Sequence, residues 1–341
     1  MHQLLLFDLP TTSPAFAQLL AQPALPATAA LCRQAVVLVQ EAPREDAQAA
    51  WLTPAERWLL NALHLEGAEA EQAPWARLAA LADGMAGALP ADQPLGLLTP
   101  AHLRLERDSL SLADPAALDL DAAEAQQLFD AVAPLFAEAG WTLRLAAPQR
   151  WYAAHPSLAE VVTAGVARAQ GRSVAAWMPG GPAARPWRQL LTQVQMTWQH
   201  HAINEARAQQ GLPDVNTLWI HGCGALPPGW RSPLRLMDAD DVVSDPALSA
   251  ALRGLAVLPR AGALAPLQLF DARHLLAADP DAGAQQLDAL LSVAIARAVQ
   301  QDGAVQLTLA GELRWRTVQI RRPQDWMFWR RTAFPALFQG L

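Results

Sequence analysis

The sequence predicts an α/β protein, in which short buried strands alternate with amphipathic helices. Apolar runs of strand length recur along the chain, among them residues 3–7, 216–220 and 267–270. Between them lie stretches with apolar residues at helical spacing, the longest over 283–300. Residues 97–152 add a compact unit whose pattern is strand, strand, helix, strand.

Length, charge and cysteine content limit the classes of protein. The 341 residues suffice for two domains or one large body with an insertion, and the net charge of −7 argues against a nucleic-acid surface. Two cysteines, Cys32 and Cys223, cannot form a disulfide framework or a zinc site. No apolar stretch approaches 18 residues and no basic region precedes the N-terminal run. We therefore expect a cytoplasmic protein without a signal peptide or membrane span.

In the first half of the chain, local signals fix each element. Residues 3–7 read as a central strand that Asp8-Leu-Pro10 ends, and a helix over 56–65 opens with the capping box Thr53-Pro54-Ala55-Glu56. Residues 103–112 alternate as a hairpin. Asp121, with Glu124 three residues on, caps a helix that ends at Gly140, and residues 141–145 and 150–152 follow as strands.

The stretch 187–224 gathers more polar groups than any other. It predicts one amphipathic helix that stops at Gly211, then a strand over 216–220 that feeds a glycine-rich bend. An inward-facing stripe recurs at helical spacing and comprises Trp187, Leu191, Val194, Trp198 and His201. His200, Asn204 and Arg207 lie together on a different side of this helix.

These polar groups have a functional and a structural interpretation. An Asn and an Arg on one helix face, with glycines that let backbone N–H groups approach an anion, could hold a phosphate or carboxylate. The candidate ligand-binding residues are His201, Asn204, Arg207, Asn216, Gly222 and Gly224. In the structural interpretation His201 is a core histidine, Asn204 is a hydrogen-bonding residue at a helix end, and the glycines form a turn.

Later elements follow the same logic. Asp245-Pro246 opens a helix to Leu255, residues 257–259 and 267–270 read as strands, and residues 305–309 and 313–320 form a closing hairpin. Residues 321–331 interleave arginines with aromatic residues, a pattern that suits RNA contact or a partner surface; in an acidic chain it favours a docking tail for a protein partner.

A family resemblance rests on the polar run of the central stretch. It reads His201-Ala-Ile-Asn204-x-x-Arg207-x-x-x-Gly211-x-Pro213-x-x-Asn216, then Gly222-x-Gly224. This resembles the His-Pro-Val-Asn, Arg, Gly-Lys-x-Pro-Ala-Asn and Gly-x-Gly run of the archaeal-type cofactor-independent phosphoglycerate mutases. It is closer still to a bacterial offshoot labelled regulator of pathogenicity factors. The specific match covers mainly residues 97–224, and Leu212 replaces the Lys of the family pattern.

The resemblance implies an alkaline-phosphatase-like α/β body over 1–95 and 190–341, with a smaller ββαβ insert domain over 96–189. It also implies metal ligands near the first strand end and in an Asp-x-x-x-His motif. The weak candidates here are Asp8, Asp271 and His274, with Asp271-Ala-Arg-His274 one residue short of that motif. A rearranged site would add the carboxylate cluster Asp238, Asp240 and Asp241.

Metal-dependent mutases need two metal ions, a nucleophilic Ser or Thr and an Asp-His pair, because phosphoryl transfer depends on charge neutralisation. This chain has no Asp-His dipeptide and no histidine after His274. The sequence therefore predicts a catalytically degenerate relative, without a cofactor, that binds a small phosphorylated or carboxylate ligand or acts as a regulatory protein. The alternatives are an active mutase or phosphatase that uses a divalent metal such as Mn or Zn, and a structural protein that binds a partner through its tail.

Overall fold

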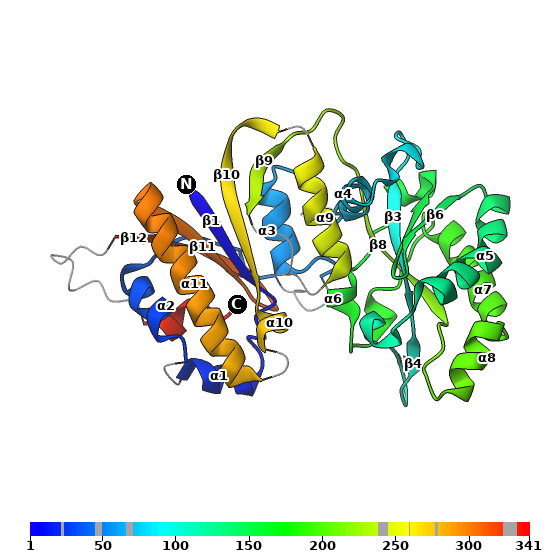
Figure 1. Ribbon diagram of the computed structural model, residues 1–341, viewed down its shortest axis with the longest axis horizontal. Coiled ribbons are helices and arrows are strands. Elements are labelled where there is room, and N and C mark those ends of the chain that lie inside the picture. Colours follow the sequence, from blue (N-terminus) through cyan, green and yellow to red (C-terminus); the bar gives the residue numbers. More distant parts are fainter. Residues whose placement is uncertain are drawn as a thin grey trace. The chain divides into compact units, whose positions relative to one another are not determined.

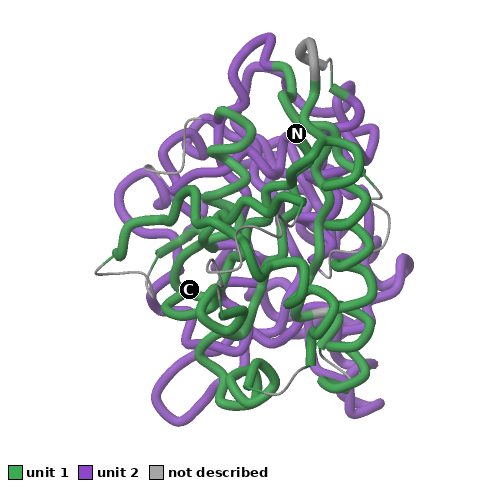
Figure 2. The backbone as a smooth tube through the Cα atoms, turned by 90° about the vertical axis from the view of Figure 1, so that its left-hand side faces the viewer, with its two compact units in different colours: residues 1–64, 231–244, 258–341 green, residues 65–230, 245–257 purple. Residues whose placement is uncertain are grey.

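A computed structural model describes residues 1–21, 24–44, 50–65, 71–237, 245–258, 260–276, 279–322 and 333–341. The chain is a mixed α/β protein, as predicted (Figure 1). It divides into two compact units, coloured separately in Figure 2: unit 1 holds residues 1–64, 231–244 and 258–341, and unit 2 holds residues 65–230 and 245–257. These limits differ from the predicted domains, since residues 65–95 and 190–230 belong to the same unit as the predicted insert.

Unit 1 is built on a six-stranded sheet. Its strand order is β2-β12-β11-β1-β10-β9. Strands β11, β1, β10 and β9 run parallel, whereas β12 and β2 are antiparallel additions at one edge. The strands are β1 (His2–Phe7), β2 (Val36–Gln40), β9 (Ser232–Met237), β10 (Arg260–Asp271), β11 (Ala304–Ala310) and β12 (Trp315–Arg321). Parallel strands place all their carboxyl ends at one edge of the sheet.

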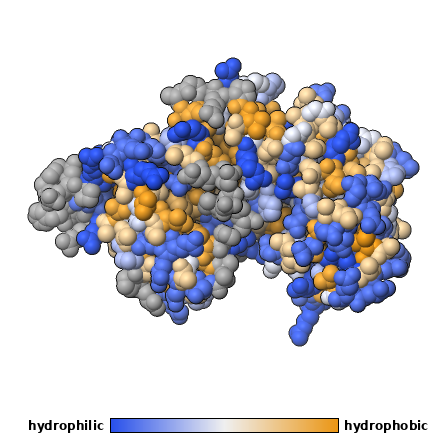
Figure 3. Space-filling view, in the orientation of Figure 1, coloured by the Kyte–Doolittle hydropathy of each residue, from blue (hydrophilic) through white to orange (hydrophobic). Residues whose placement is uncertain are grey.

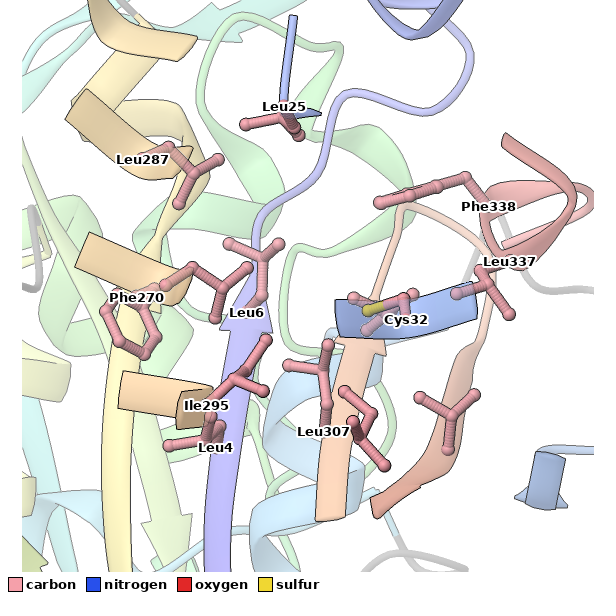
Figure 4. Close-up of a cluster of buried hydrophobic side chains, with 14 of the residues drawn as sticks. Leu4, Leu6, Leu25, Cys32, Phe270, Leu287, Ile295, Leu307, Leu337 and Phe338 are labelled. Atoms are coloured by element: carbon pink, nitrogen blue, oxygen red, sulfur yellow. The ribbon is translucent and has the colours of Figure 1, made fainter. Parts of the chain in front are cut away.

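The described helices of unit 1 are α1 (Pro14–Ala21), α2 (Pro26–Leu31), α3 (Pro54–Ala62), α10 (Ala272–Leu276) and α11 (Pro280–Asp302), with short 3₁₀ turns η1 (Cys32–Gln34) and η7 (Phe334–Phe338). Side chains of α1, α10 and α11 belong to the core cluster that buries one face of the sheet. In Figure 4, Leu4 and Leu6 of β1 lie with Leu287 and Ile295 of α11 in one buried cluster. The predicted capping box of α3 and the β11–β12 hairpin are confirmed.

Unit 2 is built on a four-stranded antiparallel sheet of order β6-β7-β3-β8, with β4 and β5 as a separate hairpin. Its strands are β3 (Leu95–Ala101), β4 (Leu103–Leu105), β5 (Leu110–Leu112), β6 (Thr142–Ala147), β7 (Arg150–Ala154) and β8 (Thr217–Gly224). Its helices are α4 (Trp75–Ala82), α5 (Ala122–Glu138), α6 (Val166–Ala169), α7 (Arg185–Gln199), α8 (Ala202–Gln209) and α9 (Pro246–Val257). Short 3₁₀ turns are η2 (Met85–Gly87), η3 (Pro115–Leu118), η4 (Pro156–Ala159) and η5 (Val174–Ala176).

Aromatic side chains fill the core of unit 2. Trp151 of β7 and Trp198 of α7 meet edge to face with their ring centroids 5.8 Å apart, and Trp187 is equally buried. Phe129 of α5 packs edge to face on Trp151 at 5.3 Å. These contacts fasten α5 and α7 to one face of the sheet, and the tryptophans supply much of the buried apolar area.

Three predictions about local structure are wrong. The helix predicted from Trp187 to Gly211 breaks at His200, so that α7 and α8 are separate helices. The predicted Gly-Cys-Gly bend is instead the end of β8, because Gly224 pairs with Leu95 of β3. Val257 belongs to helix α9 and does not begin a strand. In the second case the glycine signal persists within the strand, because Gly222 has φ at +66° and the β3–β8 register shifts there.

Helices α4 and α9 pack closely through Gly254, and substituting this glycine tests the packing. A Cβ atom added at Gly254 would overlap the carbonyl oxygen of Leu78. We expect Gly254→Ala to lower the free energy of unfolding by about 2 kcal/mol, because one helix must move away from the other. Urea unfolding followed by circular dichroism measures the change. Gly87→Ala is the control: Gly87 has open space around it, so a similar loss there would contradict the packing argument.

The surface mixes hydrophilic and hydrophobic patches on the face that Figure 3 shows. Among the described residues, β2 forms a continuous exposed apolar run, where Val36, Val37, Leu38 and Val39 are each 42–49% exposed. No single helix in the described ranges is long and apolar enough to cross a membrane, although the bent pair Pro14–Ala21 and Pro26–Gln34 meets that test by length and composition.

Candidate functional site

The carboxyl edge of the parallel strands of unit 1 brings charged side chains together. Phe7 of β1 pairs in register with Asp271, the last residue of β10. Asp8 directly follows Phe7, so Asp8 and Asp271 lie at neighbouring strand ends. Helix α10 starts directly after Asp271 and carries Arg273, whose Nη2 lies 3.6 Å from the Asp8 carboxylate. Asp271 is buried, whereas 46% of the Arg273 side chain is exposed. This edge therefore combines two carboxylates with one solvent-facing guanidinium.

Asp8 has a left-handed backbone conformation, with φ at +54°. Such a conformation costs a residue with a Cβ atom on the order of 1 kcal/mol, although Asp tolerates it better than most. It turns the chain sharply after β1, so that the Asp8 carboxylate lies next to α10. Backbone strain of this kind is common at functional sites. We therefore take Asp8, Asp271 and Arg273 as the candidate functional site.

The side chains at this edge do not by themselves fit a metal centre. Zinc sites use three or four protein ligands, and within the described ranges no group of three His, Cys, Asp or Glu residues is close enough to hold a metal ion. The cation beside Asp8 is a guanidinium. Asp238, Asp240 and Asp241 lie outside the described residues, as does the side chain of His274.

The second predicted site lies at α8 and β8 of unit 2. The side chains of Asn204 and Arg207 there already donate hydrogen bonds to other residues of the chain. The buried Asn204 amide donates to the carbonyls of Trp198 and Val215, both at 2.9 Å, and accepts from the Val215 N–H. Arg207 is 1% exposed. Its guanidinium donates to the carbonyl oxygens of Pro213 and Leu118 and to both carboxylate oxygens of Glu124. Both residues tie α8 to the segment that precedes β8. Arg207 also ties α8 to α5 and to the turn before α5.

The other residues of that predicted site also have structural partners. His201 is the N-cap of α8, where Nδ1 accepts from the Ile203 N–H, so it is not part of the helix stripe predicted for it. Asn216 bonds the backbone N–H and carbonyl of Leu103. Cβ atoms at Gly222 and Gly224 would lie 2.9 Å and 2.6 Å from the backbone of residues 76 and 73. The glycines thus let β8 pack against the start of α4. A ligand-binding role for these residues stays a prediction.

Two polar groups on the β3 and β8 strands escaped the sequence analysis. His221 of β8 is 2% exposed, and its Nε2 lies 3.0 Å from the hydroxyl of Thr99 on β3. Burial lowers the pKa of His221 to about 4, although Asp245 acts in the opposite direction. The neutral imidazole therefore sits between strands as a hydrogen-bonding residue. Side chains alternate between the two faces of the sheet along residues 217–221, so His221 lies on the same face as Trp219. This alternation is the sequence signal that could have identified His221 as buried.

A third group, around Asp83 at the end of α4, is an internal ion-pair network. Arg150 of β7 forms two hydrogen bonds to the Asp83 carboxylate, at 2.9 Å and 3.1 Å, and the Tyr152 hydroxyl donates to the same carboxylate at 2.7 Å. Burial, and then the Asp83 carboxylate, raise the pKa of Tyr152. Arg150 is only partly exposed, with 19% of its side chain accessible. Its bidentate bond to a side chain of α4 gives it a role in fixing the sheet to that helix.

The cysteines have no nucleophilic character. Cys32 and Cys223 are both buried and free. Burial raises the pKa of each thiol to about 12, so neither forms the thiolate that attacks an electrophile. The closeness of Cys223 to His221 in sequence therefore does not create a Cys-His pair, since the His221 ring bonds Thr99.

Several solved structures are similar to this chain, among them the following two. No protein-family model matches the chain, and no curated protein matches its sequence. The PH0037 protein from Pyrococcus horikoshii is 13% identical, with a TM-score of 0.48 over 95% of this chain and 89% of that one. A cofactor-independent phosphoglycerate mutase from Thermoplasma acidophilum DSM 1728 is 12% identical, with a TM-score of 0.43 over 100% of this chain and 96% of that one. At these identities, function has to be argued from the residues of this chain.

Proposed function

We propose that the protein binds a small phosphorylated or carboxylate ligand at the carboxyl edge of the unit 1 sheet, without catalysing metal-dependent phosphoryl transfer. The observation that supports this proposal is the ion pair between Asp8 and Arg273. It leaves a guanidinium half exposed at the edge where α/β proteins bind their ligands. A regulatory role would follow from reversible occupancy of this edge.

Arg273 has the chemistry that an anion requires. Its planar fork presents five N–H donors, and only one contact, to Asp8, uses them among the residues that the structure describes. A phosphate or carboxylate could bridge the outward-facing donors. Asp8 would then hold the guanidinium in place.

The Asp8–Arg273 pair also bears on catalysis. Transfer of a phosphoryl group needs charge neutralisation at the attacking and leaving oxygens, which related enzymes obtain from two metal ions. A guanidinium 3.6 Å from Asp8 opposes a divalent cation at the same carboxylate by like-charge repulsion. This favours a degenerate site over an active one.

One observation favours the alternative, an active phosphoglycerate mutase or phosphatase that uses Mn or Zn. Asp8 and Asp271 stand at adjacent parallel strand ends, and paired carboxylates are ligands for divalent cations. The remaining ligands would have to come from residues 238–241 and His274, beyond the described part of the chain. The third hypothesis, partner binding through residues 321–331, concerns a tail that mostly lies outside the described residues and stays a prediction.

Thermal unfolding with candidate ligands tests the proposal. We expect 3-phosphoglycerate or inorganic phosphate, at about one hundred times its Kd, to stabilise the protein by about 2.7 kcal/mol, which raises Tm by about 5 °C. Arg273→Ala should abolish this shift, because it removes the donors that face the anion. Arg297→Ala, which removes an exposed arginine of α11, is the matched control and should keep the shift.

A parallel assay decides between binding and catalysis. Purified protein is incubated with Mn²⁺ or Zn²⁺ and the interconversion of 2- and 3-phosphoglycerate is followed. Turnover that needs the metal and is lost in Asp8→Asn would replace the binding proposal with the enzymatic alternative. If neither anion shifts Tm and no turnover occurs, this edge of the sheet is not a phosphoglycerate or phosphate site.

A further inference from the structure

We propose that the groove beside strand β6 of unit 2 is a docking site for an extended peptide segment of a partner protein that carries a carboxylate. The partner segment would add a fifth strand to the unit 2 sheet. Its acidic side chain would pair with Arg144. The proposal is independent of the ligand site in unit 1.

The backbone of β6 specifies an extended partner. In the described part of the chain β6 pairs with β7 on one side only, so it forms an edge of the sheet. An edge strand presents a row of N–H and C=O groups that another strand can bond. Residues 141–147 lie in a well-packed part of the unit, where Trp141 is buried against Phe136 and Trp187.

Next to this edge, helix α5 leaves an open groove of about 560 Å³. One helical face lines it through Phe129, Ala133 and Ala137, which recur at spacings of four residues. The two alanines are small, so they leave room beside β6 for the side chains of an added strand. Phe129 closes the floor of the groove through its contact with Trp151. Alternate side chains of a bound strand would point into this groove.

Arg144 determines the charge of the partner. It is the one charged residue that lines the groove, and its side chain is exposed. Its Nη1 donates to the carbonyl of Leu143 on the same strand at 2.7 Å, which holds the guanidinium along the strand edge. The remaining N–H donors point to no other acceptor among the described residues. At the rim, the carboxylate of Asp130 accepts from the Gln126 amide. A carboxylate on the bound strand therefore matches the groove at Arg144.

Arg144 also argues against a second copy of this chain as the occupant. Antiparallel self-pairing of this strand centred on residue 144 would put the two Arg144 side chains directly opposite each other on the same face of the sheet. Like charges at such positions destabilise strand pairing. An acidic segment would instead bring a negative charge to the Arg144 guanidinium, and this attraction favours pairing.

Two synthetic peptides test the proposal on the full chain. One is acetyl-Thr-Val-Asp-Val-Thr-Val-Thr-amide, and the other has Lys in place of Asp. Amide chemical shifts of the ¹⁵N-labelled protein are followed up to about 2 mM peptide, which detects a Kd near 1 mM. We expect the shifts to cluster in residues 126–147, with the Asp peptide binding about tenfold more tightly than the Lys peptide, because attraction and repulsion at Arg144 add.

Charge reversal supplies the decisive comparison. Arg144→Glu should reverse the preference between the two peptides. Arg104→Glu makes the same charge change at an exposed strand residue of the β4–β5 hairpin and should leave the preference as it is. Equal binding of both peptides to the unsubstituted protein, shifts elsewhere in the chain, or no shifts at all would overturn the proposal.

Discussion

Replacing Arg207 by alanine should lower the free energy of unfolding of unit 2 by about 3–5 kcal/mol. The guanidinium is almost fully buried and makes four hydrogen bonds, two to backbone carbonyls and one to each carboxylate oxygen of Glu124. Its removal leaves the Leu118 and Pro213 carbonyls and a partly buried carboxylate without their donor, which is the costly way to break an ion pair. Urea unfolding monitored by tryptophan fluorescence measures the loss.

Arg104→Ala is the matched control for this prediction. Arg104 is an exposed arginine of the same unit, so its removal should change the stability by less than about 0.5 kcal/mol. If Arg207→Ala proves as mild as Arg104→Ala, the buried bonds of Arg207 contribute little, and a ligand-binding role for this residue becomes the better explanation of its burial.

The Arg207 result also governs how ligand experiments are designed. The sequence places Asn204 and Arg207 on one helix face, and that pairing invites an anion-binding interpretation. In the folded chain each guanidinium nitrogen of Arg207 already donates at least one hydrogen bond, so a ligand would have to exchange these bonds for its own. Loss of ligand binding in a destabilised Arg207 variant would therefore not identify a binding residue. Arg273, which is exposed, is the informative position.

Elements whose signals lie within the element itself could be predicted from the sequence. Asp121 and Glu124 form the expected capping box, and α5 follows them. The alternation over 305–320 produced the expected β11–β12 hairpin, whose strands are neighbours in sequence. In both cases the capping or hairpin interactions that mark the element lie within about twenty residues, so periodicity and capping residues contain the information that predicts it.

Contacts between distant segments could not be predicted in this way. Arg207 meets Glu124 across 83 positions, and Gly224 pairs with Leu95. A sequence pattern shows that a group is polar or that a glycine permits close approach, but it does not show which segment comes close. The same limit applies at the candidate site, where Asp8 was singled out but its partner Arg273 was not. Only the pairing of β1 with β10 brings those two residues together.

Lowering the pH from 7 to 4.5 should reduce the free energy of unfolding by about 2 kcal/mol through the titration of His221 alone. Burial lowers the pKa of this imidazole to about 4 in the folded chain, whereas an unfolded chain takes up the proton near pH 6.5. Between these two values the unfolded state binds more protons, so acid favours unfolding. The contribution of His221 is fully present above about pH 6.5 and is lost as the pH falls towards 4, about 3 kcal/mol in all.

A substitution separates this effect from the titration of carboxylates. His221→Gln can still bond the Thr99 hydroxyl but cannot take up a proton, so its stability should fall less steeply between pH 7 and 4.5 than that of the unsubstituted protein. His200→Gln, at an exposed histidine, should leave the slope unchanged. Parallel pH profiles for the unsubstituted protein and His221→Gln would mean that His221 gains its proton without unfolding. The β3–β8 strand pair would then have to admit a charged ring next to Asp245, whose carboxylate already favours the protonated form.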